Sequence, residues 1–317
     1  MSPTGPGVGL IGVGLIGLGA MGLPMARALG ACGEVTAYDA SADARARAAG
    51  LPGVTVVESL AEVAGRSGTV VLSLPSAAVV TEVVQALCPA ASGLLLLDTS
   101  TLGPDDSRRL AGLALAEGST YLDTPVLGRP DAVGRWTIPV GGPASAVVAA
   151  TEALTPVAGR VVHVGDVGAA ATLKVANNLM FSVINAVTAE ALVLVQAAGL
   201  DPGLFVDTVV DSGAATVSGL FRSIAPRAVD GDFTPTFSLD LVRKDNGLAV
   251  HLAESLGLSL GVGTAALALH ERAVDAGHGA EDSVAVLRVL EEDLGQEARR
   301  GGGPPRTPPR CTGTSGW

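Results

Sequence analysis

Two sequence patterns divide this chain near residue 165. Up to that point, short runs of valine, leucine and isoleucine alternate with alanine-rich amphipathic stretches, a pattern typical of βαβ units and a mostly parallel sheet. The expected strands are 13–16, 34–38, 69–74, 94–97, 121–122, 136–140 and 161–164. Beyond residue 168 the periodicity is helical, and a proline-free stretch from about 169 to 198 predicts one long helix. We therefore expect an α/β fold in which a doubly wound sheet precedes an all-α domain, entered by a long interdomain helix.

The second half is expected to contain only helices after this long one. Further helical stretches lie near 202–211, 215–229, 238–256, 261–276 and 281–295. Residues 296–317 contain four arginines, four prolines and a glycine run, a composition that cannot form a core. The predicted limits are thus 1–165 for the sheet domain, 166–295 for the helical domain and 296–317 for a disordered tail.

Composition excludes several classes of protein. Lys plus Arg number 20 against 31 Asp plus Glu, a net charge of −11, and no basic block occurs, which argues against nucleic acid as a partner. The three cysteines are far apart and odd in number, which suits a reducing compartment rather than disulfides or a metal site. The glycine-rich segment 1–26 suits neither a signal peptide nor a membrane span. We expect a cytoplasmic protein with no membrane partner.

A glycine-rich turn is the first candidate site. Two overlapping G-x-G-x-x-G matches begin at Gly12 and Gly17, and only the second is followed at once by a predicted helix, 24–29. We expect Gly17 to make the tight turn, Gly19 to let the backbone approach a pyrophosphate, and Gly22 to pack the helix on the strand. The predicted cofactor-binding turn comprises Gly17, Gly19, Ala20, Met21 and Gly22.

An acid follows the second predicted strand. Asp39 is placed to accept hydrogen bonds from an adenosine ribose and to repel a 2′-phosphate, which favours NAD, while Arg45 or Arg47 leaves NADP possible. This order of elements predicts a Rossmann domain that binds a dinucleotide: a strand, the glycine turn, a helix, a second strand and an acid. A glycine-rich turn without a ligand is the alternative explanation.

Two later strand ends add candidate cofactor contacts. Leu74 and Pro75 suit an apolar ledge beside the adenosine, and Ser100 and Thr101 suit contacts on the nicotinamide side. Ordinary loop chemistry explains these residues nearly as well. The four histidines show no metal spacing, so we expect no metal site.

Five segments in order resemble the β-hydroxyacid dehydrogenase family, which includes 3-hydroxyisobutyrate dehydrogenase and tartronate semialdehyde reductase. They are 17–26, 98–101 with Pro104, 123–128 with 134–142, 168–178 and 237–245. The resemblance covers roughly residues 13–290 and implies an NAD(P)-dependent oxidoreductase related to 6-phosphogluconate dehydrogenase and imine reductases. It also implies a homodimer or homotetramer, since the far face of a long apolar helix must be covered.

The chain departs from this family at one place. Members that act on small hydroxy acids usually have Ser-Gly-Gly after Pro-Val, whereas this chain has Leu127, Gly128 and Arg129. We interpret these three as substrate-binding positions. Leu127 favours a bulkier or less polar substrate, and Arg129 is either a charge for a carboxylate or phosphate or a solvated loop cation.

Lys174 is the candidate general acid/base. Hydride transfer to or from a nicotinamide requires such a group at the substrate oxygen, and Lys174 lies near the start of the long helix, where the sheet gives way to helices. The resemblance supports this role over that of a solvated lysine. Asn178 shares its helix face and is predicted to orient the substrate or the lysine. Lys244 is predicted to approach cofactor and substrate and to favour the neutral form of Lys174, unless Asp245 neutralises it.

The expected activity is hydride transfer between a nicotinamide cofactor and a small β-hydroxy acid or its semialdehyde. Two alternatives remain open. A reductase of imines or other non-acid carbonyls is favoured by Leu127 but disfavoured by Lys174. A non-catalytic dinucleotide-binding module is the other, and the complete set of motifs argues against it.

Overall fold

The computed structural model describes residues 12–301 apart from 213, 215 and 217. Internal contacts divide the chain into two compact units, Met1–Ala176 and Asn177–Trp317, which are described separately. Helix α7 (Ala169–Ala197) begins in the first unit and continues into the second.

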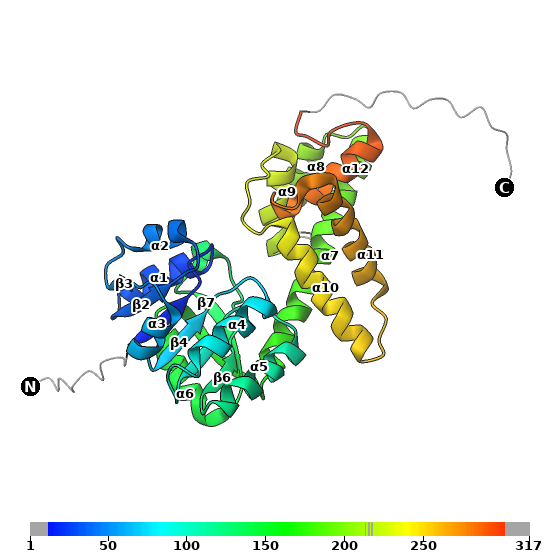
Figure 1. The fold of residues 1–317 in the computed structure, drawn as a ribbon. Helices are drawn as coiled ribbons and strands as arrows, with labels where there is room; N and C mark the ends of the chain where they lie inside the picture. Colours follow the sequence, from blue (N-terminus) through cyan, green and yellow to red (C-terminus); the bar gives the residue numbers. More distant parts are fainter. Residues whose placement is uncertain (1–11, 213, 215, 217, 302–317) are drawn as a thin grey trace, which may run out of the picture. The chain divides into compact units, whose positions relative to one another are not determined.

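The first unit contains a sheet of eight strands in the order β3-β2-β1-β4-β5-β6-β7-β8 (Figure 1). All neighbouring strands are parallel except β6 and β7. The strands are β1 Val13–Ile16, β2 Val35–Tyr38, β3 Val54–Val56, β4 Thr69–Leu72, β5 Leu95–Asp98, β6 Thr120–Asp123, β7 Trp136–Gly141 and β8 Ala158–Gly165. The chain leaves β1 in one direction for β2 and β3 and returns on its other side at β4, which makes a switch point at which doubly wound sheets bind ligands. The predicted doubly wound sheet is confirmed, although β3 was missed because it has only three residues.

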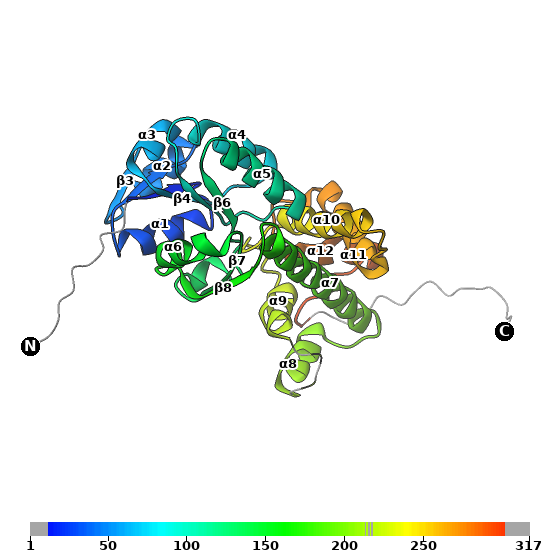
Figure 2. The same cartoon turned by 90° about the horizontal axis from the view of Figure 1, so that it is seen from below.

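Helices cover both faces of this sheet. They are α1 Gly22–Gly30, α2 Ala42–Ala48, α3 Leu60–Arg66, α4 Ala77–Leu87, α5 Pro104–Ala116 and α6 Ala144–Leu154, with a 3-10 turn η1 at Pro130–Ala132. One core cluster takes side chains from α1, α2 and α6, and the other from α3, α4 and α5, and Figure 2 shows α3, α4 and α5 together on one side of the sheet. Leu15 belongs to the first cluster and Ile16 to the second, because successive strand residues face opposite sides.

The second unit is helical in its described part, as predicted. After α7 come α8 Pro202–Ser212, α9 Gly219–Asp230, α10 Leu239–Ser255, α11 Gly261–Ala273, η2 Val274–His278, η3 Ser283–Ala285 and α12 Val286–Leu294. Leu192, Ile224 and Leu287 are among the buried side chains of its core. The expected helix 281–295 begins instead with the 3-10 turn η3, because the Asp282 carboxylate accepts the Val284 N–H and ends the preceding extended segment.

Residues 298–300, which lie in the expected tail, are packed against the helical unit. Ala298 is fully buried, Arg299 pairs with Glu291 on α12, and Arg300 pairs with Asp207 on α8 and Asp230 on α9. Acidic side chains on three helices therefore hold residues 298–300 against the helical unit. The rest of the expected tail, 302–317, lies outside the described residues.

Helix α7 is the one described helix long and apolar enough to cross a membrane, by length and composition alone. Core helices of soluble proteins meet the same criterion of length and composition. In α7, 39% of the apolar 18-residue window is buried within this chain.

Candidate active site

The carboxyl ends of β1, β2, β4, β5 and β6 carry most of the predicted site residues. Because these strands are parallel, their carboxyl ends lie at one edge of the sheet. The residues that follow them are Gly17–Gly22, Asp39, Leu74–Pro75, Ser100–Thr101 and Thr124–Arg129. The first unit thus brings the predicted cofactor and substrate segments to the same edge.

The glycine turn after β1 is shaped by its own packing. Gly17 has φ +95°, and a Cβ there would lie 2.1 Å from the Ser73 carbonyl oxygen. A Cβ on Gly22 would lie 1.9 Å from the Gly17 carbonyl oxygen, where α1 begins. Around Gly19, by contrast, nothing lies within 4 Å of the position a Cβ would take. This open approach beside the N-terminus of α1 fits the backbone cradle that a pyrophosphate needs.

Asp39 is fixed beside this turn. Its Oδ2 accepts the Leu18 N–H at 2.7 Å and its Oδ1 accepts the Ser41 N–H at 2.8 Å. Each carboxylate oxygen accepts more than one hydrogen bond, so both retain capacity for a ribose hydroxyl. Arg45 donates to the Asp39 carbonyl oxygen at 2.8 Å and to Glu58 at 2.7 Å, so its guanidinium lies at the same strand end. The residues present therefore fit a dinucleotide.

The loops after β4 and β5 are tied together. The Leu74 N–H donates to Ser100 Oγ at 2.9 Å, and the Ser100 N–H donates to Asp98 Oδ1 at 2.9 Å. The Tyr121 hydroxyl donates to Asp98 Oδ2 at 2.7 Å. Burial raises the pKa of the Asp98 carboxyl, and burial together with Asp98 raises that of the Tyr121 hydroxyl. Ser100 thus serves the loop structure. Pro75 follows Leu74 in one of these two loops, and Thr101 follows Ser100 in the other.

The three residues that depart from the family pattern lie against β7. Leu127 exchanges main-chain hydrogen bonds with Thr137 at 2.9 and 3.3 Å. The Trp136 indole N–H donates to the Arg129 carbonyl oxygen at 2.6 Å, and a Cβ on Gly128 would lie 2.1 Å from Trp136 Cδ1. Leu127 is half-buried and Arg129 is exposed. The backbone of this loop is therefore held in place, and glycine is required at its centre.

Lys174 points to the same loop region from α7. Its Nζ donates to the Val126 carbonyl oxygen at 2.8 Å, and the side chain is partly buried. The sequence contains two lysines, Lys174 and Lys244, and all its other strongly basic side chains are arginines. Lysine can lose its proton near neutral pH when its surroundings favour the neutral form, whereas arginine cannot. Both residues able to act in this way are predicted site residues.

In the second unit, Asn178 and Lys244 are joined by Asp245. Asn178 Nδ2 donates to Asp245 Oδ2 at 2.6 Å, and both residues are buried. Lys244 Nζ lies 3.2 Å from Asp245 Oδ1, so the alternative in which Asp245 pairs with Lys244 is the one observed. Asn178 follows Lys174 by four residues on α7 and so lies on the same helix face. No local sequence pattern connects Asp245 with Asn178, because the two are 67 positions apart.

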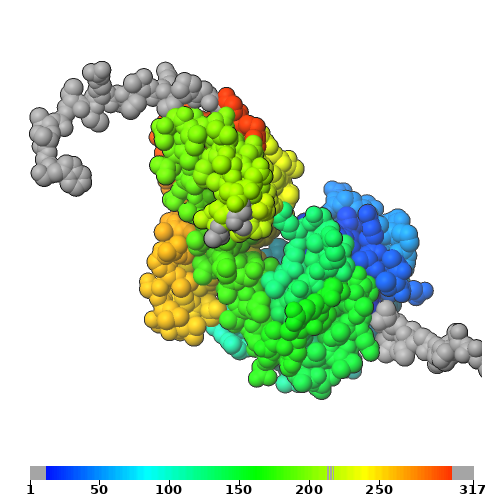
Figure 3. All heavy atoms as spheres, turned by 180° about the vertical axis from the view of Figure 1, so that it is seen from behind, coloured from blue at the N-terminus to red at the C-terminus, as the bar shows by residue number. Residues whose placement is uncertain are grey.

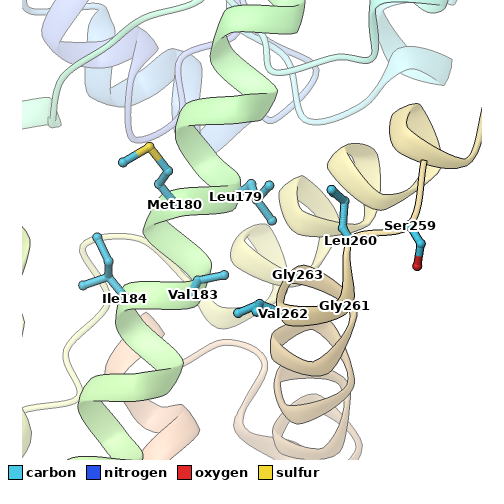
Figure 4. Close-up of a pocket in the computed structure, with 9 residues that line it drawn as sticks. All are labelled: Leu179, Met180, Val183, Ile184, Ser259, Leu260, Gly261, Val262 and Gly263. Atoms are coloured by element: carbon cyan, nitrogen blue, oxygen red, sulfur yellow. The ribbon is translucent and has the colours of Figure 1, made fainter. Parts of the chain in front are cut away.

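An apolar pocket of about 500 Å³ lies elsewhere in the second unit, between α7 and residues 259–263 (Figure 4). It is lined by Leu179, Met180, Val183, Ile184 and 259–263, and none of these side chains titrates. Among the described residues no group of three or more His, Cys, Asp or Glu is placed to hold a metal ion. The pocket is therefore not a site for proton transfer.

Comparison with known proteins agrees with this arrangement. Residues 12–165 match the family described as the NAD binding domain of 6-phosphogluconate dehydrogenase, and residues 168–290 match the one described as NAD-binding of NADP-dependent 3-hydroxyisobutyrate dehydrogenase. A probable 3-hydroxyisobutyrate dehydrogenase of Mycobacterium bovis is 31% identical over 278 residues, which cover 84% of this chain and 93% of that protein. The chain belongs to the β-hydroxyacid dehydrogenase family.

Other members of the β-hydroxyacid dehydrogenase family are similarly related. The 3-sulfolactaldehyde reductase of Escherichia coli is 31% identical over 78% of this chain and 85% of that protein. The structure of Mycobacterium tuberculosis 3-hydroxyisobutyrate dehydrogenase with L-serine has a TM-score of 0.80 at 30% identity, covering 89% of this chain and 99% of that one. A reductive aminase of Aspergillus terreus, at 23% identity and a TM-score of 0.61, shares the fold. As a family member, the chain is an NAD(P)-dependent oxidoreductase.

Proposed function

We propose that this protein transfers hydride reversibly between a nicotinamide cofactor and a small β-hydroxy acid or its semialdehyde. The observation that carries the proposal is the position of Lys174, whose ammonium meets the loop after β6 at the edge of the sheet that also carries the glycine turn. The cofactor, when bound, supplies the hydride acceptor or donor. In oxidation Lys174, as the neutral amine, takes the proton of the substrate hydroxyl, and in reduction its ammonium form returns a proton to the carbonyl oxygen.

The other proposed site residues bind the substrate and orient it toward Lys174 and the cofactor. Asn178 Nδ2 donates to Asp245, and Asn178 Oδ1 accepts Asn177 Nδ2 at 3.1 Å. An amide oxygen can accept a second hydrogen bond, which here would come from a substrate hydroxyl or an ammonium group. Leu127, in place of a serine, favours a substrate with an apolar group at this position, and Arg129 offers a positive charge for an anionic substituent. Lys244 binds near the cofactor and substrate, with its charge compensated by Asp245.

The proposed roles of the two parts of the chain correspond to the two sequence patterns. Residues 1–165 bind the dinucleotide through Gly17, Gly19, Ala20, Met21, Gly22, Leu74, Pro75 and Thr101, and Asp39 favours NAD over NADP. Residues 166–295 contribute to substrate binding and to association between copies of the chain. The protein is proposed to work in the cytoplasm without a nucleic-acid or membrane partner, in keeping with its acidic charge.

A homodimer or homotetramer is part of this proposal. Met180, Val187 and Leu194 are 65%, 54% and 69% exposed and recur every seven residues on α7, which is the spacing of a helix seam that packs on a partner. In Figure 3 the green surface of α7 adjoins the orange surface near residue 260, where Leu256, Leu258 and Val262 are also exposed. These exposed apolar side chains favour a partner, and a second copy of the chain carries the same seam.

An absorbance assay of nicotinamide reduction tests the proposed reaction. Purified protein is compared with Lys174→Ala and Lys174→Arg, using NAD and NADP with small β-hydroxy acids, longer or aromatic analogues, and cyclic imines. We expect hydroxy-acid turnover in the native protein and a fall in kcat of at least about 100-fold in both variants, because arginine keeps the charge but cannot exchange the proton. Cofactor affinity should change by less than about threefold, since Lys174 acts on the substrate.

Other outcomes contradict the proposal in distinct ways. Turnover of imines alone would assign the protein to imine reduction. Tight cofactor binding without turnover of any substrate would identify a non-catalytic dinucleotide-binding module.

A further inference from the structure

A buried carboxylate joins the end of β6 to the start of α7. Asp123 is 2% exposed, and its two oxygens accept the Gly168 N–H at 2.9 Å and the Ala171 N–H at 2.7 Å. The first amides of a helix have no partner within the helix, and an anion at this end also meets the positive end of the helix dipole. Asp123 therefore satisfies the N–H of Gly168, immediately before α7, and the N–H of Ala171 in its first turn, across 45 and 48 positions of sequence.

The surroundings leave this carboxylate little freedom. A Cβ on Gly141, which pairs with Asp123 across β6 and β7, would lie 2.4 Å from Asp123 Oδ1. Gly168 has φ +94°, and a Cβ there would lie 3.1 Å from the Pro104 carbonyl oxygen. Gly141 thus allows β7 to approach the carboxylate closely, and Gly168 allows the backbone before α7 to approach the start of α5.

The same short segment contacts α7 a second time. Val126 lies three residues after Asp123, and its carbonyl oxygen accepts the Lys174 ammonium, which lies three residues after Ala171 on α7. The 123–126 segment therefore holds the first turn of α7 through a side chain and the lysine of the next turn through the main chain.

We propose that Asp123 is a positioning residue for Lys174, holding the first turn of α7 on the end of β6 so that the ammonium is placed at the edge of the sheet. The catalytic consequence rests on the proposed function, whereas the placement of Lys174 does not. An error of about 1 Å in the position of a reacting group costs on the order of 100-fold in rate, so the anchoring of α7 matters to the reaction as well as to folding.

The charges near Asp123 determine in which direction the titration midpoint of Lys174 should move when Asp123 is replaced. Asp98, whose pKa burial raises, interacts with Asp123, and Arg108 lies close to Gly168. Asp123→Asn removes a negative charge near the start of α7. The Gly168 and Ala171 N–H groups then face an asparagine side chain, which has one accepting oxygen in place of two. Both changes disfavour the ammonium form of Lys174, so its titration midpoint should move to lower pH.

The titration midpoint of Lys174 can be measured directly, because the sequence contains only two lysines. Protein labelled with carbon-13 at lysine Cε gives two side-chain resonances, which a Lys244→Arg sample assigns. In Asp123→Asn we expect the Lys174 resonance to shift and its titration midpoint to fall by at least about half a pH unit, while the Lys244 resonance stays unchanged.

Ser119→Ala is the matched control. Ser119 is buried at the other end of the same strand, where its Oγ accepts the Leu94 N–H at 3.3 Å, so its loss weakens β6 without touching α7. Both lysine resonances should keep their titration midpoints in this control. An unchanged Lys174 resonance in Asp123→Asn, or the same shift in Ser119→Ala, would overturn the proposal.

Kinetics separate this proposal from the proposed function. With an active native protein, Asp123→Asn should lower kcat at least about tenfold with cofactor affinity within about threefold, and Ser119→Ala should leave both unchanged. If the native protein turns over none of the substrates, the proposed function fails, while the resonance experiment still decides the placement of Lys174.

Gly141→Ala is the second variant, for use if Asp123→Asn does not fold. It keeps the Asp123 carboxylate but displaces it, because the added Cβ would lie 2.4 Å from Asp123 Oδ1. The proposal then requires that Gly141→Ala shift the Lys174 resonance.

Discussion

At the scale of single residues, the carboxylate of Asp39 is the proposed contact for the adenosine ribose of the cofactor. It accepts two main-chain N–H groups and so presents a fixed negative charge, and Arg45 is bound to the carbonyl oxygen of the same residue. A ribose with free hydroxyls can donate to this charge, whereas a 2′-phosphate is repelled by it. Removal of the carboxylate should leave Arg45 as the dominant charge there.

Asp39→Ala is therefore expected to weaken NAD binding about tenfold or more, because hydrogen bonds to a charged group are worth about 1.5–3 kcal/mol. NADP binding should be unchanged or tighter, and calorimetric titration with each cofactor measures both. Asp43→Asn removes an exposed charge from the first turn of α2 and serves as the control. An equal loss of affinity for NAD and NADP would show that Asp39 acts on the turn rather than on the ribose.

At the scale of elements, Asp282 connects the extended segment after α9 to η3. It is 1% exposed, accepts the Thr236 N–H and hydroxyl at 2.7 Å each, and lies 3.1 Å from Arg227 Nη1. Burial alone would raise the pKa of Asp282, but the hydrogen bonds from Thr236, Val284 and Arg227 outweigh it and hold that pKa below its usual value. Its contribution to stability is thus present above about pH 4, the value for an unfolded chain, and is lost as pH falls through the folded-state pKa.

Asp282→Asn should lower the free energy of unfolding of the helical unit by about 3 kcal/mol at pH 7, because it leaves buried donors and Arg227 without their charged partner. The loss of stability on acidification should also become shallower. Hydrogen exchange of α9–α12 peptides at several pH values measures both effects. Asp275→Asn, at an exposed carboxylate, should stay within about 0.5 kcal/mol of the native protein. A similar effect of the two substitutions would contradict the assignment of this network.

At the scale of the whole molecule, the exposed seam on α7 predicts association. Val187 lies at its centre, so Val187→Lys places a charge where an apolar contact is expected. Light scattering after size exclusion should give a multiple of 31.4 kDa for the native protein and 31.4 kDa for this variant. Leu115→Lys alters a 73% exposed leucine on α5, which is not part of the seam, and should leave the mass unchanged. A native protein that is monomeric at tens of micromolar would rule out the seam as an interface.

The sequence by itself determined most of the elements of this protein and their order, although not the three-residue strand β3 or the 3-10 turn η3. The turn at Gly17, the alternation of strands and helices and the length of α7 follow from local patterns, since each depends on residues within a few turns of one another. It also pointed to Lys174, because the motif around that residue is continuous along the chain.

Only the tertiary structure decided which side chains meet across the fold. Asp123 reaches the start of α7, Asp245 joins Asn178 to Lys244, and Arg300 reaches Asp207. These contacts link residues far apart in sequence, and a carboxylate gives no local sign of which distant amide or cation it will meet. Burial and partner choice are set by how the elements pack, and that packing also ordered residues that composition alone had assigned to a tail.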